Sequence, residues 1–356
     1  MAKKHSKEYY ARKKHRRRVR AFWRAFRRTL LVLFTIVFLV AIAAVAGAAV
    51  LAKGPSPTLS DQAVGMALES SAAKFAPYIY FTDEEVEAIK ARNSIQVTDD
   101  EVDTSLVTIA AEENDGDNGS GGDDQGETEE KDIEIVAVRG ATYNGYMMIV
   151  KDPSRVSVGV SNGLGSQAGM QLAKIAEKYG AIGAINAGGF ADANGMGDGG
   201  TPIGPVISQG KIVWRNGGGA NNVVIGLTKE NKLVFGTMSA STAYDKGIRD
   251  AVTFGPVLVK NGKGMEVSGV GSLNPRTAIG QRGDGAILLL VVNGRKVNAL
   301  GATYADLIDI FLQFGAVNAA NLDGGTSSFM YYDGELINDS ASLYGTRKIP
   351  TTWIVK

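Results

Sequence analysis

Residues 321–328 read Asn321-Leu322-Asp323-Gly324-Gly325-Thr326-Ser327-Ser328, which is one carboxylate, one carboxamide, two glycines and three hydroxyls among eight residues. Apolar segments flank this stretch, FGAVNAA at 314–320 and FMYY at 329–332. A polar turn hinged on glycine between two buried segments presents acid and hydrogen-bonding groups in a cleft. A second turn of this kind is Asn186-Ala187-Gly188-Gly189-Phe190. The sequence therefore predicts one site built from two loops.

Charged residues near these turns suggest the chemistry of the site. Asp323 lies between a predicted buried strand and Gly-Gly, so it is either an Asx-turn residue or a catalytic group; we favour catalysis. Arg276 directly precedes a predicted strand, and its guanidinium suits bidentate phosphate recognition, with a surface ion pair as the alternative. Arg347, in Gly345-Thr346-Arg347-Lys348, is a similar candidate with the same alternative. Residues 192–198 have oxygen ligands at alternating positions, which leaves room for a divalent cation, although a surface loop is the simpler interpretation.

The composition excludes several classes of chemistry. The 356 residues include no cysteine, which excludes disulfides, thiolate catalysis and cysteine-based metal sites. Both histidines, His5 and His15, precede the apolar segment described next, so Ser-His-Asp, Cys-His and His-zinc sites are excluded from the remainder. No cofactor is required by the sequence.

The N-terminal part predicts a single membrane span. Thirteen Lys or Arg and one Glu precede Thr29, and an uncharged apolar run follows at 30–52. A run of ~20 apolar residues spans a bilayer, and the basic flank favours a cytoplasmic N-terminus. We therefore expect a signal-anchor: residues 1–29 form a basic cytoplasmic tail, 30–52 cross the cell membrane, and the C-terminal domain is extracellular. The alternative is a cleaved signal peptide, which usually has an apolar region of ~7–15 residues.

The remainder divides by composition into three further regions. Residues 53–98 read as a helical stalk, in which Thr82-Asp83-Glu84-Glu85 predicts a capping box at the start of a helix. Residues 99–132 read as an acidic disordered linker rich in Gly. Residues 133–356 predict an α+β domain with mixed, largely antiparallel sheets. The expected strands include 133–139, 156–160, 206–214 and 351–355, and helices are expected at 166–179 and 304–314, the second capped at or near Thr303. The similar positions of the two glycine turns suggest two similar halves. After Arg28 the chain has 25 basic and 36 acidic residues, a net charge of −11, which argues against a nucleic-acid partner.

The order of these motifs resembles the phosphodiester glycosidase family, of the N-acetylglucosamine-1-phosphodiester alpha-N-acetylglucosaminidase type, whose bacterial members are often labelled exopolysaccharide-related. The resemblance rests on 186–190, on Gly-Pro segments at 204–207 and 255–259, on Arg276-Thr277-Ala278-Ile279-Gly280, and on 321–328. It covers roughly residues 133–356.

The resemblance implies hydrolysis of a sugar-1-phosphodiester to a free sugar and a phosphomonoester, on a cell-envelope or exopolysaccharide glycan. Asp323 and Arg276 would be catalytic. The substrate-binding residues would be Asn186, Gly188, Gly189, Asn321, Gly324, Gly325, Thr326, Ser327 and Arg347.

Two questions stay open at the level of sequence. Glycoside cleavage usually needs two carboxyl groups, and the partner of Asp323 is Asp192, Asp198 or Asp306. The same site would also suit a non-catalytic envelope glycan-binding module, which holds a polymer without cutting it.

Overall fold

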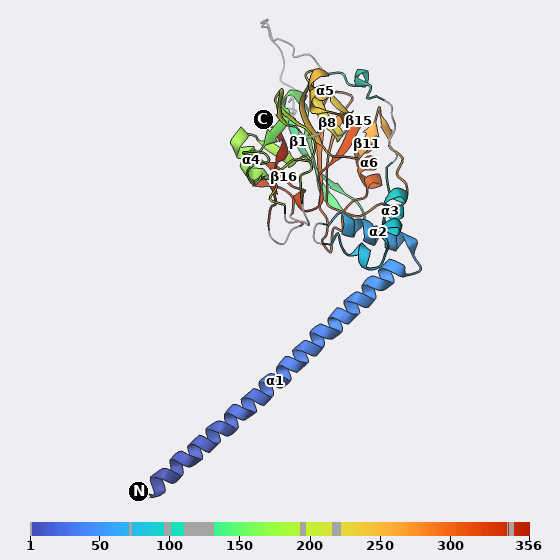
Figure 1. Cartoon of the computed structure of the whole chain (residues 1–356). Coiled ribbons are helices and arrows are strands. Elements are labelled where there is room, and N and C mark those ends of the chain that lie inside the picture. The colour runs from blue at the N-terminus through green and yellow to red at the C-terminus, as the bar shows by residue number, and fades with distance from the viewer. Residues whose placement is uncertain are drawn as a thin grey trace, which may run out of the picture. The chain divides into compact units, whose positions relative to one another are not determined.

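The computed structural model describes residues 2–70, 73–95, 101–109, 132–192, 197–215, 222–339, 341 and 345–356 (Figure 1). The chain forms two compact units, Met1–Ser60 and Asp61–Lys356. The first contains helix α1 (Ala2–Lys53), which includes the apolar run. This helix is long and apolar enough to cross a membrane, a test that a signal sequence also passes.

The second unit contains short helices and many strands. The α-helices after α1 are α2 (Pro57–Leu68), α3 (Asp83–Arg92), α4 (Leu172–Tyr179), α5 (Ala240–Asp245) and α6 (Tyr304–Gln313). The strands are β1 (Ile133–Arg139), β2 (Asn144–Val150), β3 (Val156–Val160), β4 (Met170–Gln171), β5 (Gly183–Asn186), β6 (Val206–Ser208), β7 (Lys211–Trp214), β8 (Asn222–Thr228), β9 (Leu233–Met238), β10 (Ile248–Thr253), β11 (Val257–Lys260), β12 (Lys263–Gly264), β13 (Arg276–Arg282), β14 (Ile287–Val292), β15 (Ala316–Leu322), β16 (Met330–Tyr332), β17 (Glu335–Leu336), β18 (Lys348–Ile349) and β19 (Thr351–Val355).

The strands form three larger sheets, which confirms the predicted α+β fold with largely antiparallel sheets. Their orders are β1-β2-β14-β13-β15-β11-β12, β7-β6-β10-β8-β9 and β17-β16-β5-β19-β3, with β18-β4 as a small fourth sheet. Neighbouring strands within these sheets run antiparallel, as in β13–β15 and β5–β19. The two glycine turns follow strands of different sheets, β5 and β15. The strand pairing therefore gives three sheets and not the two similar halves that the turns suggested.

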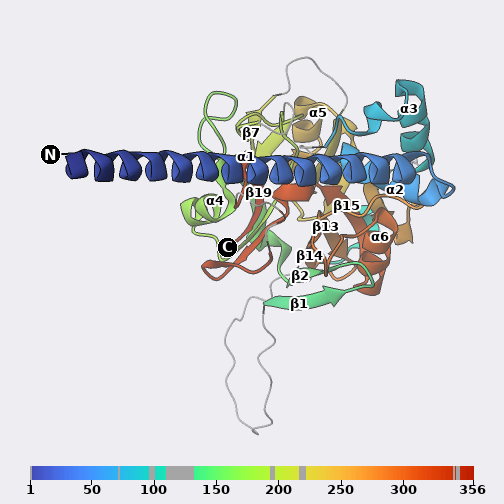
Figure 2. The ribbon, with the colours of Figure 1, turned by 90° about the horizontal axis from the view of Figure 1, so that it is seen from below.

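The central sheet is buried on both faces, which explains its apolar strands. In β14, Ile287 and Leu289 face a core shared by the three sheets, whereas Leu288 and Leu290 face a second core that includes Phe311 of α6. Strands buried on both faces read as continuous apolar runs, as this one does. Figure 2 shows α6 beside β13 and β15, and α4 beside β19. Both glycine turns follow strands that contact helices, since α4 also contacts β5 and α6 contacts β15.

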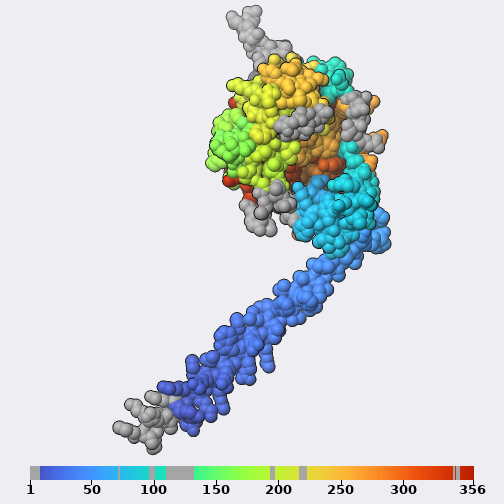
Figure 3. All heavy atoms as spheres, in the orientation of Figure 1, coloured from blue at the N-terminus to red at the C-terminus, as the bar shows by residue number. Residues whose placement is uncertain are grey.

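Residues 61–95, predicted as part of a stalk, belong to the same compact unit as the domain. The expected capping box at Thr82 and Glu85 is present at the start of α3. Asn93 then accepts hydrogen bonds from the backbone N–H groups of Val270 and Gly271, at 3.1 and 3.2 Å. Figure 3 shows the cyan surface of this segment against the domain.

The predicted disordered linker needs a correction at its start. Residues 101–109 are described and contain a short 3-10 helix, Thr104–Leu106. Val107 is buried, and the N–H of Asp103 donates to Asn261 Oδ1 at 2.7 Å. The buried Val107 and this hydrogen bond therefore attach residues 101–109 to the domain despite their acidic surroundings. Residues 110–131, which hold most of the acidic run, lie outside the described residues.

Two predicted elements differ in their bounds. The strand expected at 206–214 is a hairpin, because Gln209 and Gly210 turn the chain with positive φ. The helix expected from 166 begins at 172, because Met170 and Gln171 pair with β18 instead. Helix α5 was not predicted.

Candidate active site

The two glycine turns meet where strands of two sheets end. Asn186, the last residue of β5, donates from Nδ2 to the backbone carbonyl of Asp323 at 2.5 Å. Its Oδ1 accepts from Thr277 Oγ1 at 2.8 Å, and the N–H of Asp323 donates to the carbonyl of Ala187 at 3.0 Å. Asn186 is 1% exposed, so it connects the sheets and positions Asp323. It was predicted to bind substrate, but its side chain is committed to these bonds.

A pocket of about 300 Å³ lies at this junction. Its lining includes seven of the predicted site residues: Gly189, Arg276, Asn321, Asp323, Gly324, Gly325 and Arg347. Glu69, Lys74, Phe190, Asp192 and Tyr304 also line it. The structure therefore brings most of the predicted residues together, from segments far apart in the sequence.

Arg276 forms one side of the pocket. Its guanidinium stacks 4.3 Å from the centroid of the Tyr304 ring, and Nη1 lies 2.6 Å from the Glu69 carboxylate. The Arg276 side chain is only 3% exposed, and Nε donates to the Ala302 carbonyl at 3.2 Å. Burial alone would lower the pKa of Arg276, but the Glu69 carboxylate and Tyr304 raise it above its usual value. The result is a fixed cation with its planar end held in one orientation.

Arg347 repeats this arrangement on another side. Its guanidinium lies 4.7 Å from the centroid of the Phe190 ring, and Nη2 lies 2.5 Å from Asp192 Oδ1. Each arginine is therefore backed by an aromatic ring and paired with a carboxylate. An arginine held this way can present its N–H groups to an oxyanion with little loss of side-chain entropy.

Asp323 lies in the same pocket and titrates unusually high. Burial raises the pKa of its carboxyl from 3.8 to about 6, and the charge of Asp192 adds to this effect. Hydrogen bonds from Ser327 and Gly324 and the charge of Arg347 act in the opposite direction. A pKa near neutrality suits a group that gives or takes a proton at physiological pH.

Asn321 adds a polar group that is not fully satisfied within the protein. Its Nδ2 donates to the Gly255 carbonyl at 2.9 Å, but its buried Oδ1 has no hydrogen-bond partner among the described residues. Buried amide oxygens are usually paired. Since Asn321 lines the pocket, this oxygen is suited to accept a hydrogen bond from a bound hydroxyl.

The remaining predicted residues support the turn. Gly325 adopts φ +64°, a conformation that favours glycine, and its N–H donates to the Pro275 carbonyl at 2.9 Å. Ser327 is buried against Asp323, whereas Thr326 is partly exposed and does not line the pocket. Gly188 donates from its N–H to Thr351 Oγ1 at 3.0 Å and also lies outside the lining.

The structure distinguishes the three candidates for a second carboxylate. Asp192 lines the pocket. Asp306 caps α6 through Thr303, with its Oδ2 2.7 Å from the Thr303 backbone nitrogen, and Asp198 accepts from the Gly200 N–H at 2.9 Å. Of the loop considered for a cation, 193–196 lie outside the described residues. Within the part of the chain that is described, no three His, Asp or Glu side chains gather into a metal-binding group.

Sequence reasoning missed Glu69 and Tyr304. Glu69 precedes Arg276 by 207 residues and lies in a region interpreted as a stalk, so no local pattern indicated it. Tyr304 begins the predicted helix, where an aromatic residue reads as core. Phe190 was part of the quoted motif, but nothing in the sequence indicated that it would stack on Arg347.

The chain is similar to several known proteins. A family described as phosphodiester glycosidase matches residues 179–356. The mouse N-acetylglucosamine-1-phosphodiester alpha-N-acetylglucosaminidase is 25% identical over 220 residues, which is 55% of this chain and 41% of the mouse protein. The SPbeta prophage-derived uncharacterized protein YomE of Bacillus subtilis (strain 168) is 38% identical over 107 residues, 29% of this chain and 17% of YomE. The chain thus spans less than half the length of these relatives.

Among solved structures, the zebrafish N-acetylglucosamine-1-phosphodiester alpha-N-acetylglucosaminidase catalytic domain, auto-inhibited by its pro-peptide, has a similar fold. The TM-score is 0.54 at 23% identity, over 64% of this chain and 85% of the zebrafish chain. At this identity the likeness concerns the fold alone.

Proposed function

Because this chain belongs to the phosphodiester glycosidase family, we propose that it hydrolyses a sugar-1-phosphodiester to a free sugar and a phosphomonoester. The observation that carries this proposal is the pocket in which Asp323 lies with two arginines, each backed by an aromatic ring. Two fixed cations around an ionisable acid suit a substrate with a phosphate next to a bond that is cut with proton transfer.

Arg276 and Arg347 would bind the phosphodiester. A guanidinium offers two parallel N–H groups to phosphate oxygens, and both arginines are held rigidly enough to do so. Their contacts would strengthen as negative charge collects on the departing phosphate, which lowers the barrier of the reaction.

Asp323 would act as the general acid. With a pKa of about 6, a useful fraction of this carboxyl is protonated at mildly acidic to neutral pH. In the reaction the bond between the anomeric carbon and the phosphate oxygen breaks, and Asp323 gives its proton to the departing oxygen. The hydroxyl of water joins the anomeric carbon, and the remaining proton of that water passes to a second carboxylate. Asp192, ion-paired with Arg347, is the ionised carboxylate suited to assist the attack.

Glu69 would compete with the substrate for Arg276. Its carboxylate lies where a phosphate oxygen would bind, 2.6 Å from Nη1. Glu69 lies just after α2, in a segment that precedes residue 133, and the zebrafish relative is described as auto-inhibited by its pro-peptide. We propose that substrate displaces Glu69 before Arg276 can hold phosphate.

The membrane assignment extends this proposal to a location and a substrate. Helix α1 and the basic residues before Thr29 support a single-pass anchor with a cytoplasmic N-terminus and an extracellular domain. The substrate would then be a cell-envelope or exopolysaccharide glycan with sugar-1-phosphate links.

The test is product analysis with the full chain in detergent micelles. The methyl phosphodiester of N-acetylglucosamine 1-phosphate would be incubated with wild type, Asp323→Asn, and the matched control Asp333→Asn, which changes an exposed turn carboxylate. We expect free N-acetylglucosamine and methyl phosphate from wild type and the control, and a rate lower by roughly 10²–10⁴ in Asp323→Asn. Binding of this compound without release of free sugar would favour the glycan-binding module.

A further inference from the structure

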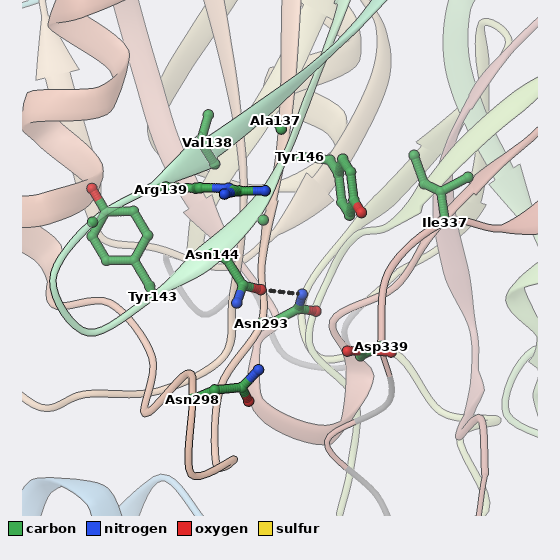
Figure 4. A pocket seen from close by; sticks show the side chains of 12 residues that line it. Ala137, Val138, Arg139, Tyr143, Asn144, Tyr146, Asn293, Asn298, Ile337 and Asp339 are labelled. Carbon is green, nitrogen blue, oxygen red and sulfur yellow. Dashed lines mark hydrogen bonds between the residues drawn. The ribbon is translucent and has the colours of Figure 1, made fainter.

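A second pocket lies at the end of the β1–β2 hairpin, outside the candidate active site. Its volume is about 520 Å³, and Figure 4 shows the side chains around it. The walls come from both ends of the hairpin turn, from the turn after β14, and from the segment that follows β17. None of its lining residues belongs to the pocket that holds Asp323.

The two pockets open along one edge of the central sheet, which is formed by the start of β13, the end of β14 and the start of β2. Val292, at the end of β14, pairs with Arg276 on one side and with Gly145 on the other. Adjacent strands lie ~4.8 Å apart, so the start of β2 is roughly 10 Å from Arg276 along this edge.

Arg295 lies between the two pockets. Its Nη2 donates to Asn274 Oδ1 at 3.0 Å, two residues before Arg276. The Arg295 guanidinium also lies next to Gly325, because a Cβ added to this glycine would be 3.4 Å from both terminal nitrogens of the arginine. Since Asn293, two residues earlier in the same turn, lines the second pocket, this turn connects the two pockets.

The second pocket has the side chains that bind a sugar. Asn338 Nδ2 donates to Asn293 Oδ1 at 3.2 Å, and Asn293 Nδ2 donates to Asn144 Oδ1 at 2.7 Å. These bonds fix the orientation of the Asn144 amide, whose nitrogen points toward the side where Asn298 lies (Figure 4). The ring of Tyr146 forms an adjacent wall. Aromatic faces pack on the apolar C–H face of a pyranose, while amides bind its hydroxyls.

The charges in this pocket favour an anionic ligand. Asp339 is paired with Lys296 at 3.0 Å, so its negative charge is offset. Arg139 contributes a further cation, and its side chain points toward Tyr146 in Figure 4. Arg276, Arg295 and Arg139 thus follow one another along the sheet edge.

We propose that this pocket is a second subsite that binds the sugar next to the scissile bond, with Arg139 binding that sugar's phosphate. The natural substrate is then an oligomer or polymer whose sugars are joined by phosphodiesters. Cleavage of the bond next to this subsite rests on the proposed function, but binding of a sugar at the subsite does not.

The experiment uses the full chain in micelles and three probes: the methyl phosphodiester described above, a tetramer of N-acetylglucosamine joined through 1-phosphodiesters, and chitotetraose. The variants are Tyr146→Ala, Asn298→Ala in an exposed turn, and Arg139→Gln, with Tyr244→Ala on exposed α5 as the matched control. Thermal melting checks that each variant is folded, and Asn298→Ala carries the test if Tyr146→Ala fails to fold.

We expect the ratio of kcat/KM for the tetramer to that for the methyl phosphodiester to fall about tenfold in Tyr146→Ala and severalfold in Asn298→Ala, and to stay constant in Tyr244→Ala. The tetramer should also bind at least tenfold more tightly than chitotetraose, and Arg139→Gln should reduce this preference. A ratio unchanged in the pocket variants, or equal binding of the two tetramers, overturns the subsite.

Calorimetric binding of the tetramer, measured in the Asp323→Asn background so that the probe stays intact, and cleavage assays of the wild type together separate this proposal from the proposed function. A chain that binds the tetramer in a Tyr146- and Asn298-dependent way without cutting it supports the subsite and contradicts the hydrolase. A chain that cuts both phosphodiesters with the same ratio in every variant supports the hydrolase and overturns the subsite.

Discussion

Replacement of Glu69 by Gln removes the charge that competes for Arg276 and keeps the shape of the side chain. In the wild type the carboxylate forms a charge-assisted hydrogen bond of 2.6 Å with Nη1 and a longer one of 3.4 Å with Nη2. Hydrogen bonds to charged groups contribute ~1.5–3 kcal/mol, and Glu69 is 34% exposed, so screening by water reduces this to about 1–2 kcal/mol. Substrate that must break this contact loses the same free energy.

Glu69→Gln should therefore lower KM about 5- to 30-fold for the methyl phosphodiester, because each 1.4 kcal/mol corresponds to a factor of ten. The assay is steady-state release of free sugar, with Glu87→Gln, which loses an exposed carboxylate on α3, as the matched control. The variant also leaves Arg276 buried without its carboxylate, so its melting temperature should fall and should recover more than that of the wild type when inorganic phosphate is added. A KM that rises, or a kcat that collapses with KM unchanged, would show that Glu69 assists the reaction instead of opposing the substrate.

Further predictions concern the acid, the arginine and the topology. If Asp323 is the general acid, kcat/KM should be constant below pH 6 and fall tenfold for each pH unit above it. A kcat/KM that rises through pH 6 would show instead that the reaction requires ionised Asp323. The pKa of Asp323 in the folded chain exceeds 3.8, so ionisation of this carboxyl destabilises the fold progressively between about pH 4 and 6. Asp323→Asn should therefore be more stable than wild type at pH 8, by at most about 3 kcal/mol in the free energy of unfolding, and should show no gain at pH 3. Chemical denaturation at the two pH values would measure both differences. Arg276→Lys keeps the charge but loses the bidentate fork, so kcat and kcat/KM should fall together; a change in KM alone would assign Arg276 to ground-state binding. Protease added to intact cells should cut the acidic segment at 110–131, and the C-terminal fragment should stay with the membrane until denaturation, because residues 61–95 and 101–109 belong to the same compact unit as the domain. Protection of the segment until lysis would reverse the topology.

Local patterns were sufficient to predict most of the fold. The strands at 133–139, 156–160 and 351–355 have the predicted bounds, because each is a short apolar run between turn residues. The start of α6 was readable from Thr303, which forms a capping box with Asp306. The turn at Gln209 and Gly210 was missed because a single glycine in an apolar run does not by itself indicate a hairpin.

The site was predictable only where it depends on the two glycine turns. Asp323 and Arg276 lie in one pocket as expected, because their strands, β15 and β13, are neighbours in the central sheet. The supporting function of Asn186 was not predictable, since it depends on bonds to Asp323 and Thr277 that only the tertiary structure forms. Glu69 was out of reach for the same reason.

Product release from the methyl phosphodiester by the full chain is the measurement that tests the account most directly. We expect wild type and Asp333→Asn to release free N-acetylglucosamine and methyl phosphate in equal amounts. Asp323→Asn should lose roughly 10²–10⁴ in rate while its melting temperature at pH 6 is no lower than that of wild type, as the assignment of Asp323 as the general acid requires. Equal rates of release from wild type and folded Asp323→Asn would contradict it.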